Sequence, residues 1–389
     1  MPGGPRRTRP ACSCRIDGPM LDRRISVAPM MGRTDRHCRY FLRGFSAGML
    51  LYTEMIGASD LIRDARSRLL EFDAGEHPVA LQLGGCDPQE LAAAARLAEQ
   101  AGYDEINLNC GCPSDRATGK VFGAYLMQRP DTVVACVAAM RAAVRVPVTV
   151  KMRIGVVGGR GRAAIEASRG FEEPERAALH SLVGRVRDAG CEAVIVHARK
   201  AVLGGLSAQE NREIPPLRYD VVTELKRAFP DLQIIVNGGL REPAAVLRAL
   251  EGLDGVMLGR EAYHRPMVLG ELDTLVFGAA PAAADPSRDR HPPAASARRR
   301  AVERMQRYAE RQLGRGERLS AIVRHMQGLY AGEPGALEFR RTLSEGSRRC
   351  GAGAEVLAQA YANAEAHAES CGVAPAEDLR AQAPTLFAA

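Results

Sequence analysis

Short apolar segments recur along the first two thirds of the chain, and helical patterns separate them. The eight segments span residues 25–32, 49–54, 78–85, 105–116, 146–153, 191–197, 232–239 and 254–260. Near-continuous apolar strands that alternate with helices are typical of a parallel sheet covered on both faces. Eight such units within about 240 residues predict an α/β fold, a closed (β/α)8 TIM barrel, in preference to an open doubly wound sheet.

Polar side chains fall at or near the carboxyl ends of these strands. They are Gln82, Asn107, Asn109, Lys151, His197, Asn237 and Arg260. Barrel enzymes place their active sites at this face. Each residue alone is consistent with a hydrogen-bonding role at the barrel rim, but their occurrence on six separate strands favours a functional site.

The fourth segment ends in a loop that carries a thiol. Residues 105–110 alternate apolar and polar side chains as a strand does, and Gly111 and Pro113 then break the strand. Cys112 in this loop could be a nucleophile, a metal ligand or a proton donor, because a thiol titrates near pH 8.5 unless its neighbours shift it. A structural cysteine beside a tight turn is the alternative.

Two turns predict a phosphate site. Asn237-Gly238-Gly239 follows the seventh strand and Leu258-Gly259-Arg260 follows the eighth. Many barrels bind phosphate there, because glycine lets backbone N–H groups approach the oxygens and arginine adds a planar charged donor. Lys151 and Gln82 would point over the barrel axis, and Pro29-Met30-Met31 would offer backbone and apolar contacts. A flavin mononucleotide fits these features.

Charge is distributed unevenly along the 389 residues, whose formal net charge is +7. Residues 1–24 carry +4 and residues 299–350 carry +6, which leaves −3 for the remainder. We expect a basic tail over 1–22, the barrel over 23–278, a linker over 279–298, a helical domain over 299–372 and a loose tail over 373–389. The basic helical domain predicts a polyanionic partner.

Composition argues against export, membrane spans and metal sites. No apolar run approaches the roughly 18 residues of a membrane helix, and the N-terminus lacks the apolar core of a signal peptide, so we expect a cytoplasmic protein. The 10 cysteines include no C-x-x-C pair. We therefore expect neither a disulfide framework nor a metal site.

Seven motifs together resemble the tRNA-dihydrouridine synthases over roughly residues 24–350. They are Ala28-Pro29-Met30-Met31, Leu81-Gln82-Leu83-Gly84-Gly85, Asn107-Leu108-Asn109-Cys110-Gly111-Cys112-Pro113-Ser114, Val150-Lys151-Met152-Arg153-Ile154-Gly155, His197-Ala198-Arg199-Lys200, Asn237-Gly238-Gly239 and Gly259-Arg260-Glu261-Ala262-Tyr263. Segments 35–40, 210–217 and 324–326 resemble the bacterial branch that acts on uridines 20 and 20a of the tRNA D-loop.

The resemblance implies an FMN-dependent oxidoreductase that reduces a uracil ring with electrons from NADPH. FMN would be bound by Pro29, Met30, Met31, Gln82, Lys151, His197, Asn237, Gly238, Gly239, Gly259 and Arg260. Cys112 would be the catalytic acid that protonates C5 after hydride reaches C6, with Cys110 a bystander.

The same resemblance implies that tRNA is the partner. Its contacts would be Asn109, Gln209, Arg212 and Arg340, and the target base would flip out of the tRNA elbow. Two positions depart from the family pattern: Gln209 stands where a basic residue is expected, and Leu337 where an arginine is expected. The glycine- and arginine-rich segment 158–169 is either a further RNA contact or a solvated loop.

Two other readings remain open from sequence. One is a flavin-dependent barrel that oxidises or reduces a small molecule, such as a dihydropyrimidine or dihydroorotate dehydrogenase. The other is an RNA-binding protein without catalysis on a barrel scaffold. The basic helical domain weighs against the first, because a small substrate gives no reason for a charge of +6 over 299–350. A bound flavin would exclude the second.

Overall fold

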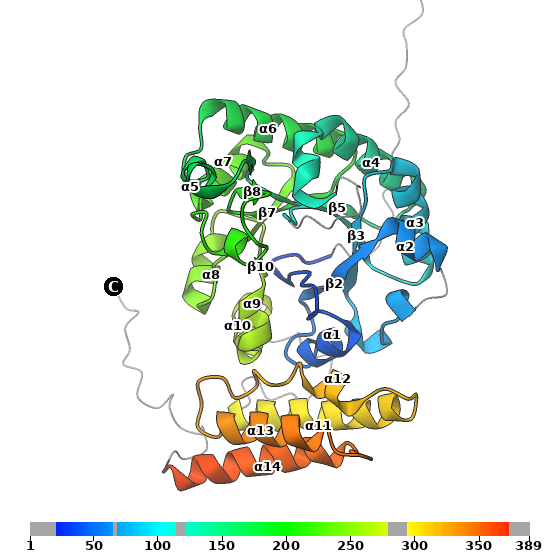
Figure 1. Ribbon diagram of the computed structural model, residues 1–389, viewed down its shortest axis with the longest axis vertical. Helices are drawn as coiled ribbons and strands as arrows, with labels where there is room; N and C mark the ends of the chain where they lie inside the picture. The colour runs from blue at the N-terminus through cyan, green and yellow to red at the C-terminus, as the bar shows by residue number, and fades with distance from the viewer. Residues whose placement is uncertain (1–20, 65–67, 114–121, 279–293, 373–389) are drawn as a thin grey trace, which may run out of the picture.

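The computed structural model describes residues 21–64, 68–113, 122–278 and 294–372, and these form a barrel joined to a helical module (Figure 1). Eight parallel strands close the barrel in the order β1-β10-β9-β7-β5-β4-β3-β2, which confirms the predicted (β/α)8 fold. They are β1 (Ile25–Val27), β2 (Leu50–Gly57), β3 (Val79–Gly84), β4 (Glu105–Cys110), β5 (Val148–Arg153), β7 (Ala193–His197), β9 (Gln233–Asn237) and β10 (Gly255–Leu258).

Helices on the outside connect the strands. They are α1 (Arg36–Leu42), α2 (Ala58–Arg63), α3 (Pro88–Gln100), α4 (Pro130–Ala143), α6 (Glu173–Asp188), α7 (Tyr219–Ala228), α8 (Pro243–Leu250), α9 (Arg260–His264) and α10 (Met267–Phe277), with 3-10 turns η1 (Arg68–Leu70), η2 (Ala74–Glu76), η3 (Gly123–Gln128) and η4 (Glu210–Arg212). Helix α3 begins as its sequence predicts: the Asp87 side chain accepts from two backbone N–H groups, and Pro88 occupies the first turn, where no N–H partner is needed. None of the described helices is long and apolar enough to cross a membrane.

The strands bury side chains on both sides. Inside the barrel an apolar cluster contains Ala28, Leu50, Tyr52, Ala80, Ala193, Ile195, Ile235 and Met257. Beneath it, Glu105 accepts from Arg23 at 2.7 Å and from Thr149 at 2.6 Å. The carboxylate is fully buried, so these donors offset the cost of its desolvation. This polar floor lies near the amino ends of the strands, and the opposite ends are left for the site.

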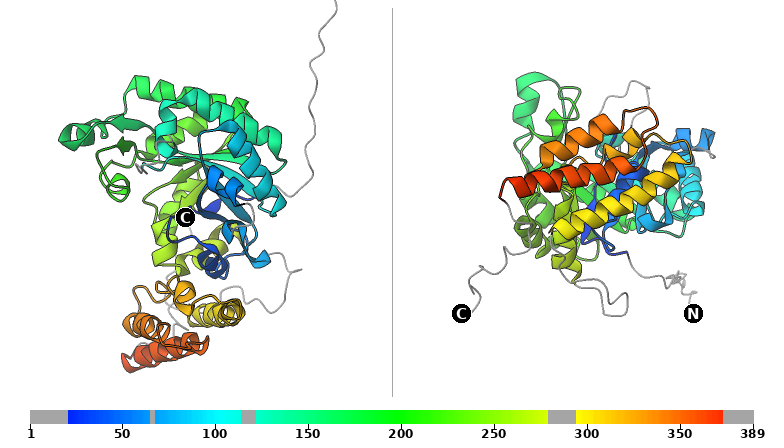
Figure 2. Two further views of the ribbon diagram at one scale, coloured as in Figure 1. Left: turned by 45° about the vertical axis from the view of Figure 1, so that its right-hand side comes forward. Right: turned by 90° about the horizontal axis from the view of Figure 1, so that it is seen from below.

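The connection from β5 to α6 is longer than a simple crossover and leaves the barrel. It contains β6 (Val156–Gly158) and α5 (Gly161–Ala167), and β6 pairs with β8 (Ala201–Leu203), which follows β7. We call residues 155–170 the excursion; it projects from the barrel in the left view of Figure 2. Residues 161–167 of the glycine- and arginine-rich segment 158–169 form the short helix α5, so this segment is not an irregular loop throughout.

The C-terminal module contains α11 (Ala294–Leu313), α12 (Leu319–Val323), α13 (Ala336–Gly346) and α14 (Glu355–Ser370). Helix α11 begins inside the predicted linker 279–298, because the good helix formers from Ala294 onward continue without a break into the arginine-rich stretch. Residues 319–329 form a helix only to Val323 and continue as turns. Nearly all of the predicted N-terminal tail, most of the linker and the C-terminal tail lie outside the described residues.

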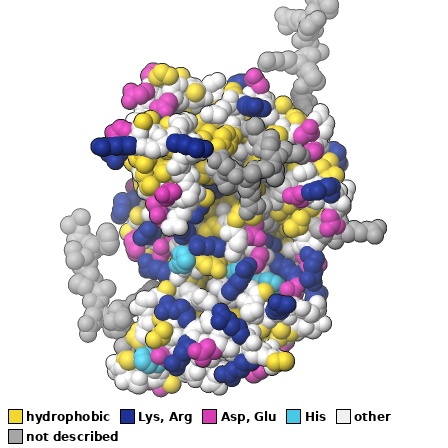
Figure 3. Space-filling view, in the orientation of Figure 1, with side chains coloured by type: hydrophobic (Ala, Val, Ile, Leu, Met, Phe, Trp, Pro, Cys, Tyr) yellow, Lys and Arg dark blue, Asp and Glu magenta, His cyan; other side chains and the backbone are white. Residues whose placement is uncertain are grey.

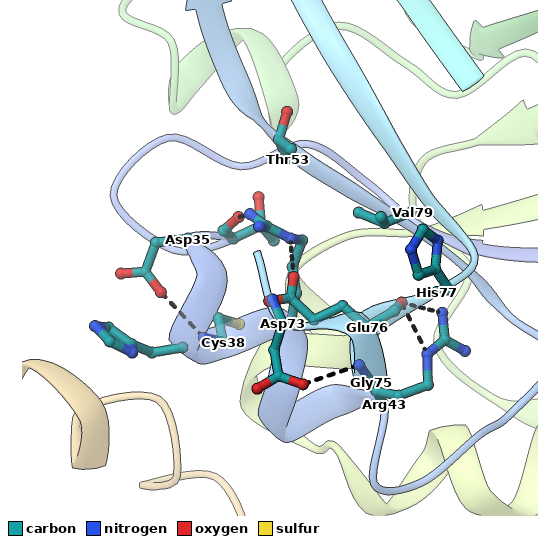
Figure 4. Close-up of polar contacts among 12 residues, drawn as sticks. Asp35, Cys38, Arg43, Thr53, Asp73, Gly75, Glu76, His77 and Val79 are labelled. Carbon is teal, nitrogen blue, oxygen red and sulfur yellow. Dashed lines mark hydrogen bonds and ion pairs between the residues drawn. The ribbon is translucent and has the colours of Figure 1, made fainter. Parts of the chain in front are cut away.

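Helix α1 connects the barrel to the module. The rings of Tyr40 and Tyr308 stack with their centroids 4.1 Å apart, and Arg36 pairs with Glu317 at 2.6 Å. Asp35 caps α1 by accepting from the Cys38 N–H (Figure 4) and also contacts Arg324 at 2.6 Å. Aromatic stacking and charged contacts thus hold the module at one edge of the barrel.

A second set of contacts fixes α1 to the segment that leads into β3. Glu76 is fully buried and pairs with Arg39 at 2.7 Å. The Arg43 guanidinium donates to the backbone carbonyl of Glu76, and Asp73 accepts from the Gly75 N–H, as Figure 4 shows. These bonds satisfy the buried charges that link α1 to the barrel wall.

Candidate active site at the barrel mouth

The loop after β4 is held by side-chain and backbone hydrogen bonds. The Asn109 side-chain oxygen accepts from the N–H groups of Gly111 and Cys112, both at 3.0 Å. The Cys112 carbonyl accepts from the Ala124 N–H at 2.9 Å. Cys112 itself is partly exposed, in contrast to Cys110, whose thiol is fully buried in β4. Burial raises the pKa of the Cys110 thiol, which makes it a poor proton donor or nucleophile.

A chain of buried amides lies across the strand ends. The Gln82 amide nitrogen donates to Asn107 at 2.7 Å, and the Asn109 amide nitrogen donates to the Gln82 oxygen at 2.7 Å. Asn107 in turn donates to Thr149 at 2.8 Å. Because each of these amides is bonded to its neighbour, the chain fixes the height and orientation of Asn109 and of the Cys112 loop above it.

Lys151 lies near the carboxyl end of β5, two residues before the last residue of the strand, Arg153. Its ammonium donates to the Asn237 side chain at 2.9 Å, and Asn237 donates to the Met257 carbonyl at 2.8 Å. No carboxylate of the described residues forms an ion pair with Lys151. Burial lowers the pKa of Lys151 to about 7, and repulsion from Arg153 adds to this effect.

Further basic side chains surround Lys151. Burial lowers the pKa of His197 well below its ordinary value, and repulsion by Arg153, Lys151 and Arg199 acts in the same direction. Burial, together with repulsion from Arg212 and Arg199, lowers the pKa of Arg153 to about 9. Cys112 lies within electrostatic reach of Lys151 and Arg153. The mouth therefore concentrates positive charge beside the thiol, which is the environment of a site for an electron-rich ligand.

Arg153 has a structural role that the sequence did not reveal. Its buried guanidinium donates to the carbonyls of Gly111 at 3.0 Å, Lys200 at 3.0 Å and Asn211 at 2.9 Å. It thereby joins the Cys112 loop to the segments that follow β7. Arg153 stands two residues after Lys151 in the sequence, and this spacing was the available signal. The backbone carbonyls that Arg153 contacts are distant in sequence.

The two glycine turns form a narrow backbone cradle. Gly238 and Gly239 have φ angles of 116° and 72°, which only glycine adopts readily. A Cβ atom on Gly238 would lie 2.6 Å from the His197 ring, and one on Gly239 would collide with Leu217. The Tyr219 hydroxyl donates to the Gly238 carbonyl at 2.6 Å and fixes the turn. Side-chain-free backbone at this place fits a phosphate group.

Arg260 lies at the same strand ends but is engaged by a carboxylate. It begins α9 after Gly259, and its guanidinium contacts Glu213 at 2.6 Å with both side chains partly exposed. A phosphate would have to share the Arg260 guanidinium with the Glu213 carboxylate or displace that carboxylate. Sequence reasoning missed Glu213, because nothing in the spacing relates it to Arg260.

The loop after β1 supplies the remaining predicted cofactor residues. Pro29 and Met30 are partly buried, Met30 packs against the apolar cluster inside the barrel, and Met31 is 49% exposed. The Thr34 hydroxyl accepts from the Met30 N–H at 2.9 Å. The predicted cofactor residues thus occupy the carboxyl ends of strands β1, β3, β5, β7, β9 and β10 of one barrel.

The four predicted RNA contacts do not form one cluster. Asn109 is buried at the barrel mouth, whereas Gln209 and Arg212 are exposed in the segment of η4. Arg340 is exposed on α13 of the helical module. In Figure 3, dark-blue arginine and lysine side chains gather where the barrel meets the module. Within the described ranges, no group of three or more His, Cys, Asp and Glu residues is arranged to hold a metal ion.

Comparison with known proteins identifies the family. The family model described as dihydrouridine synthase matches residues 26–365. The tRNA-dihydrouridine(20/20a) synthase of Pseudomonas aeruginosa is 49% identical over 324 residues, which are 83% of this chain and 90% of the relative. The enzymes of that name from Xanthomonas campestris and Vibrio cholerae are 48% and 46% identical, over 87% of this chain and 92% and 96% of theirs. The chain, with its cationic barrel mouth and the thiol beside it, therefore belongs to the dihydrouridine synthase family.

Proposed function

We propose that this protein is a tRNA-dihydrouridine synthase that reduces the C5=C6 bond of uridines 20 and 20a. The observation that carries the proposal is the cluster of Lys151, Arg153 and His197 beside Cys112, in which no described carboxylate forms an ion pair with any of the three. Such a site favours an electron-rich ligand next to a proton donor. The relatives that match most of this chain are tRNA-dihydrouridine(20/20a) synthases, which supports these two positions.

FMN fits the residues at this mouth. The bare backbone of Gly238 and Gly239, with Gly259 and Arg260, would hold its phosphate. Gln82, Lys151, His197 and Asn237 would surround its ring, together with the loop of Pro29, Met30 and Met31. When bound and reduced by NADPH, FMN supplies the hydride for C6 of the uracil.

Cys112 would protonate C5 of the same ring. Its thiol proton goes to C5 as the C6 hydride is delivered, and the thiolate that remains takes a proton from solvent. Lys151 and Arg153 would stabilise that thiolate through their positive charges. Asn109 holds the loop through two N–H bonds, so the thiol is positioned before the substrate arrives.

The tRNA would be held outside the mouth while one base enters it. A uracil stacked in the tRNA elbow cannot reach a site at the strand ends, so the base must flip out. Exposed Arg212 and Gln209 lie beside the opening, and exposed Arg340 lies on the helical module, whose segment 299–350 carries +6. These residues would contact the phosphate backbone, which makes binding dependent on salt.

Activity on undermodified tRNA tests the proposal. The purified protein, NADPH and tRNA from cells without dihydrouridine synthases should yield dihydrouridine, counted by mass spectrometry of the nucleosides. The alternative, an FMN barrel for a small molecule, predicts turnover of dihydroorotate or dihydrouracil instead. Protein that turns over these compounds and leaves tRNA unmodified would refute the proposal.

A further inference from the structure

We infer that the excursion, residues 155–170, is a second tRNA-binding lip of the barrel mouth, with Arg160 and Arg162 as its phosphate contacts. The inference rests on the proposed function and extends it. It adds a contact surface on the β5 side of the barrel, separate from the helical module.

The acidic side chains of the excursion and its flank already have partners. Glu166 lies 3.6 Å from Arg169, and Glu173 lies 3.3 Å from Arg176. Glu175 pairs with Lys200 at 2.5 Å, and Glu172 is bonded to the backbone in a capping box at the start of α6. Their negative charges are therefore partly offset by nearby basic side chains or by backbone N–H groups.

The two arginines at the tip differ from these residues. Arg160 and Arg162 are exposed, and neither forms an ion pair with a described carboxylate. They lie in the sequence Gly159-Arg160-Gly161-Arg162, in which both glycines have positive φ angles, 106° and 69°. The tip thus presents two uncompensated positive charges on a short, tightly turned backbone, as a polyanion-binding surface requires.

The tip is packed onto the segment that leads to Arg212. A Cβ atom on Gly205 would lie 2.7 Å from the Gly159 carbonyl and 3.1 Å from the Arg160 Cα, so the two backbones touch there. The chain from Gly205 continues through Gln209 to Arg212. The tip and the predicted RNA contacts of this segment are therefore neighbours on one side of the mouth.

Buried bonds tie this side of the mouth to the catalytic loop. Asn211 accepts from the Val202 N–H at 2.7 Å and donates to the Val202 carbonyl at 3.0 Å, which locks β8 to η4. The Asn211 carbonyl accepts from Arg153, which also donates to Gly111 beside Cys112. The tip that would hold RNA is thus connected to the Cys112 loop by buried hydrogen bonds, so its position relative to the thiol is fixed.

The position of the excursion favours an extended partner. In Figure 2 (left view) it projects from the barrel at the end remote from the helical module. A small substrate in the mouth would not reach its tip. A tRNA that spans the mouth would contact the module on one side and the tip on the other, and two phosphate contacts would add to affinity without reading sequence.

Charge reversal at the tip tests the inference. We compare the full-length double variant Arg160→Glu/Arg162→Glu with the control Arg96→Glu/Arg145→Glu, which changes the same charge at exposed arginines on α3 and before β5, away from the strand carboxyl ends. The probe is unmodified tRNA, and its Kd is measured from 50 to 300 mM KCl. Flavin absorbance and NADPH-driven flavin reduction report whether each variant is folded.

The tip variant should bind tRNA on the order of 10-fold more weakly than the control at 100 mM KCl. Its slope of log K against log salt should be shallower by about 2, because each lost phosphate contact removes about 0.9 from the slope. Equal affinity and equal slope in the two variants would overturn this inference alone. If the unaltered protein fails to bind tRNA, the proposed function falls and the inference falls with it.

Discussion

Lys151 should gain a proton when negative charge develops at the barrel mouth, and this uptake can be counted. Burial and Arg153 lower the pKa of Lys151 from 10.5 to about 7, so the amine is mostly neutral above pH 8. This lowering of the pKa corresponds to a free energy of about 5 kcal/mol that disfavours the ammonium form relative to the neutral amine. A full negative charge about 4 Å away contributes about 4 kcal/mol at an effective dielectric constant of 20. Reduction of a bound flavin to its anion should therefore restore the ammonium form up to about pH 9.

The assay is the midpoint potential of the bound flavin between pH 7.5 and 9. Two-electron reduction to the anion takes up one proton, which gives about 30 mV per pH unit, and a second proton on Lys151 doubles this slope. We expect about 60 mV per pH unit in the unaltered protein and about 30 in Lys151→Met, a variant that keeps the length of the side chain. Equal slopes in the two proteins would refute the reasoning that Lys151 changes its charge.

Stability of the flavin-free protein gives an independent check with a defined sign. The pKa of Lys151 is lower in the folded protein than in the unfolded chain, so the unfolded chain binds more protons between pH 7 and 10.5. Stability must then rise with pH across that window, and the cost of the buried charge is fully present below it. Lys151→Met should accordingly raise the Tm more at pH 6.5 than at pH 10. An equal change at both pH values would contradict the lowered pKa.

Four further substitutions test other parts of the site and fold. Cys112→Ala should abolish dihydrouridine formation while NADPH still reduces the flavin, whereas Cys110→Ala should keep most activity; equal loss in both would indicate a structural role for the loop. Arg260→Ala should weaken flavin retention on dilution, measured by fluorescence of released FMN, and unchanged retention would remove Arg260 from the phosphate site. Asp35→Asn keeps a capping side chain for α1 but loses the charge that faces Arg324, and should lower stability by about 1–2 kcal/mol at pH 7. The pKa of Asp35 is lowered, so that loss should shrink as pH falls below the ordinary value of 3.8; a loss that stays constant to pH 3 would exclude the ion pair as its cause.

The barrel and most residues of its mouth could be predicted because the fold makes their positions regular. All eight strands are parallel, so residues at or near their carboxyl ends, such as Lys151 and Asn237, meet at one face whatever their distance in sequence. The observed hydrogen bond between these two side chains follows from their positions near the carboxyl ends of β5 and β9. The turn at Gly238 and Gly239 was equally accessible, since glycine is favoured where the backbone adopts positive φ.

Other features depend on contacts that leave no periodic signal. Arg153 bonds to three backbone carbonyls, and any residue can supply a carbonyl, so its partners cannot be read from side-chain types. The pair of Arg260 with Glu213 joins the start of α9 to the segment after η4, and the tertiary fold sets the approach of these two segments. The strands β6 and β8 have only three residues each, too few to show alternation. Composition alone does not mark the start of α11, because the alanine-rich end of the predicted linker also consists of good helix formers.

The most direct measurement maps dihydrouridine along tRNA after reaction with the purified protein and NADPH. Chemical cleavage or arrest of reverse transcription at dihydrouridine gives the modified positions one by one. The account predicts new signals at positions 20 and 20a with the unaltered protein, the same signals with Cys110→Ala, and none with Cys112→Ala. Absence of dihydrouridine from the D-loop, or equal signals with Cys112→Ala, would contradict it.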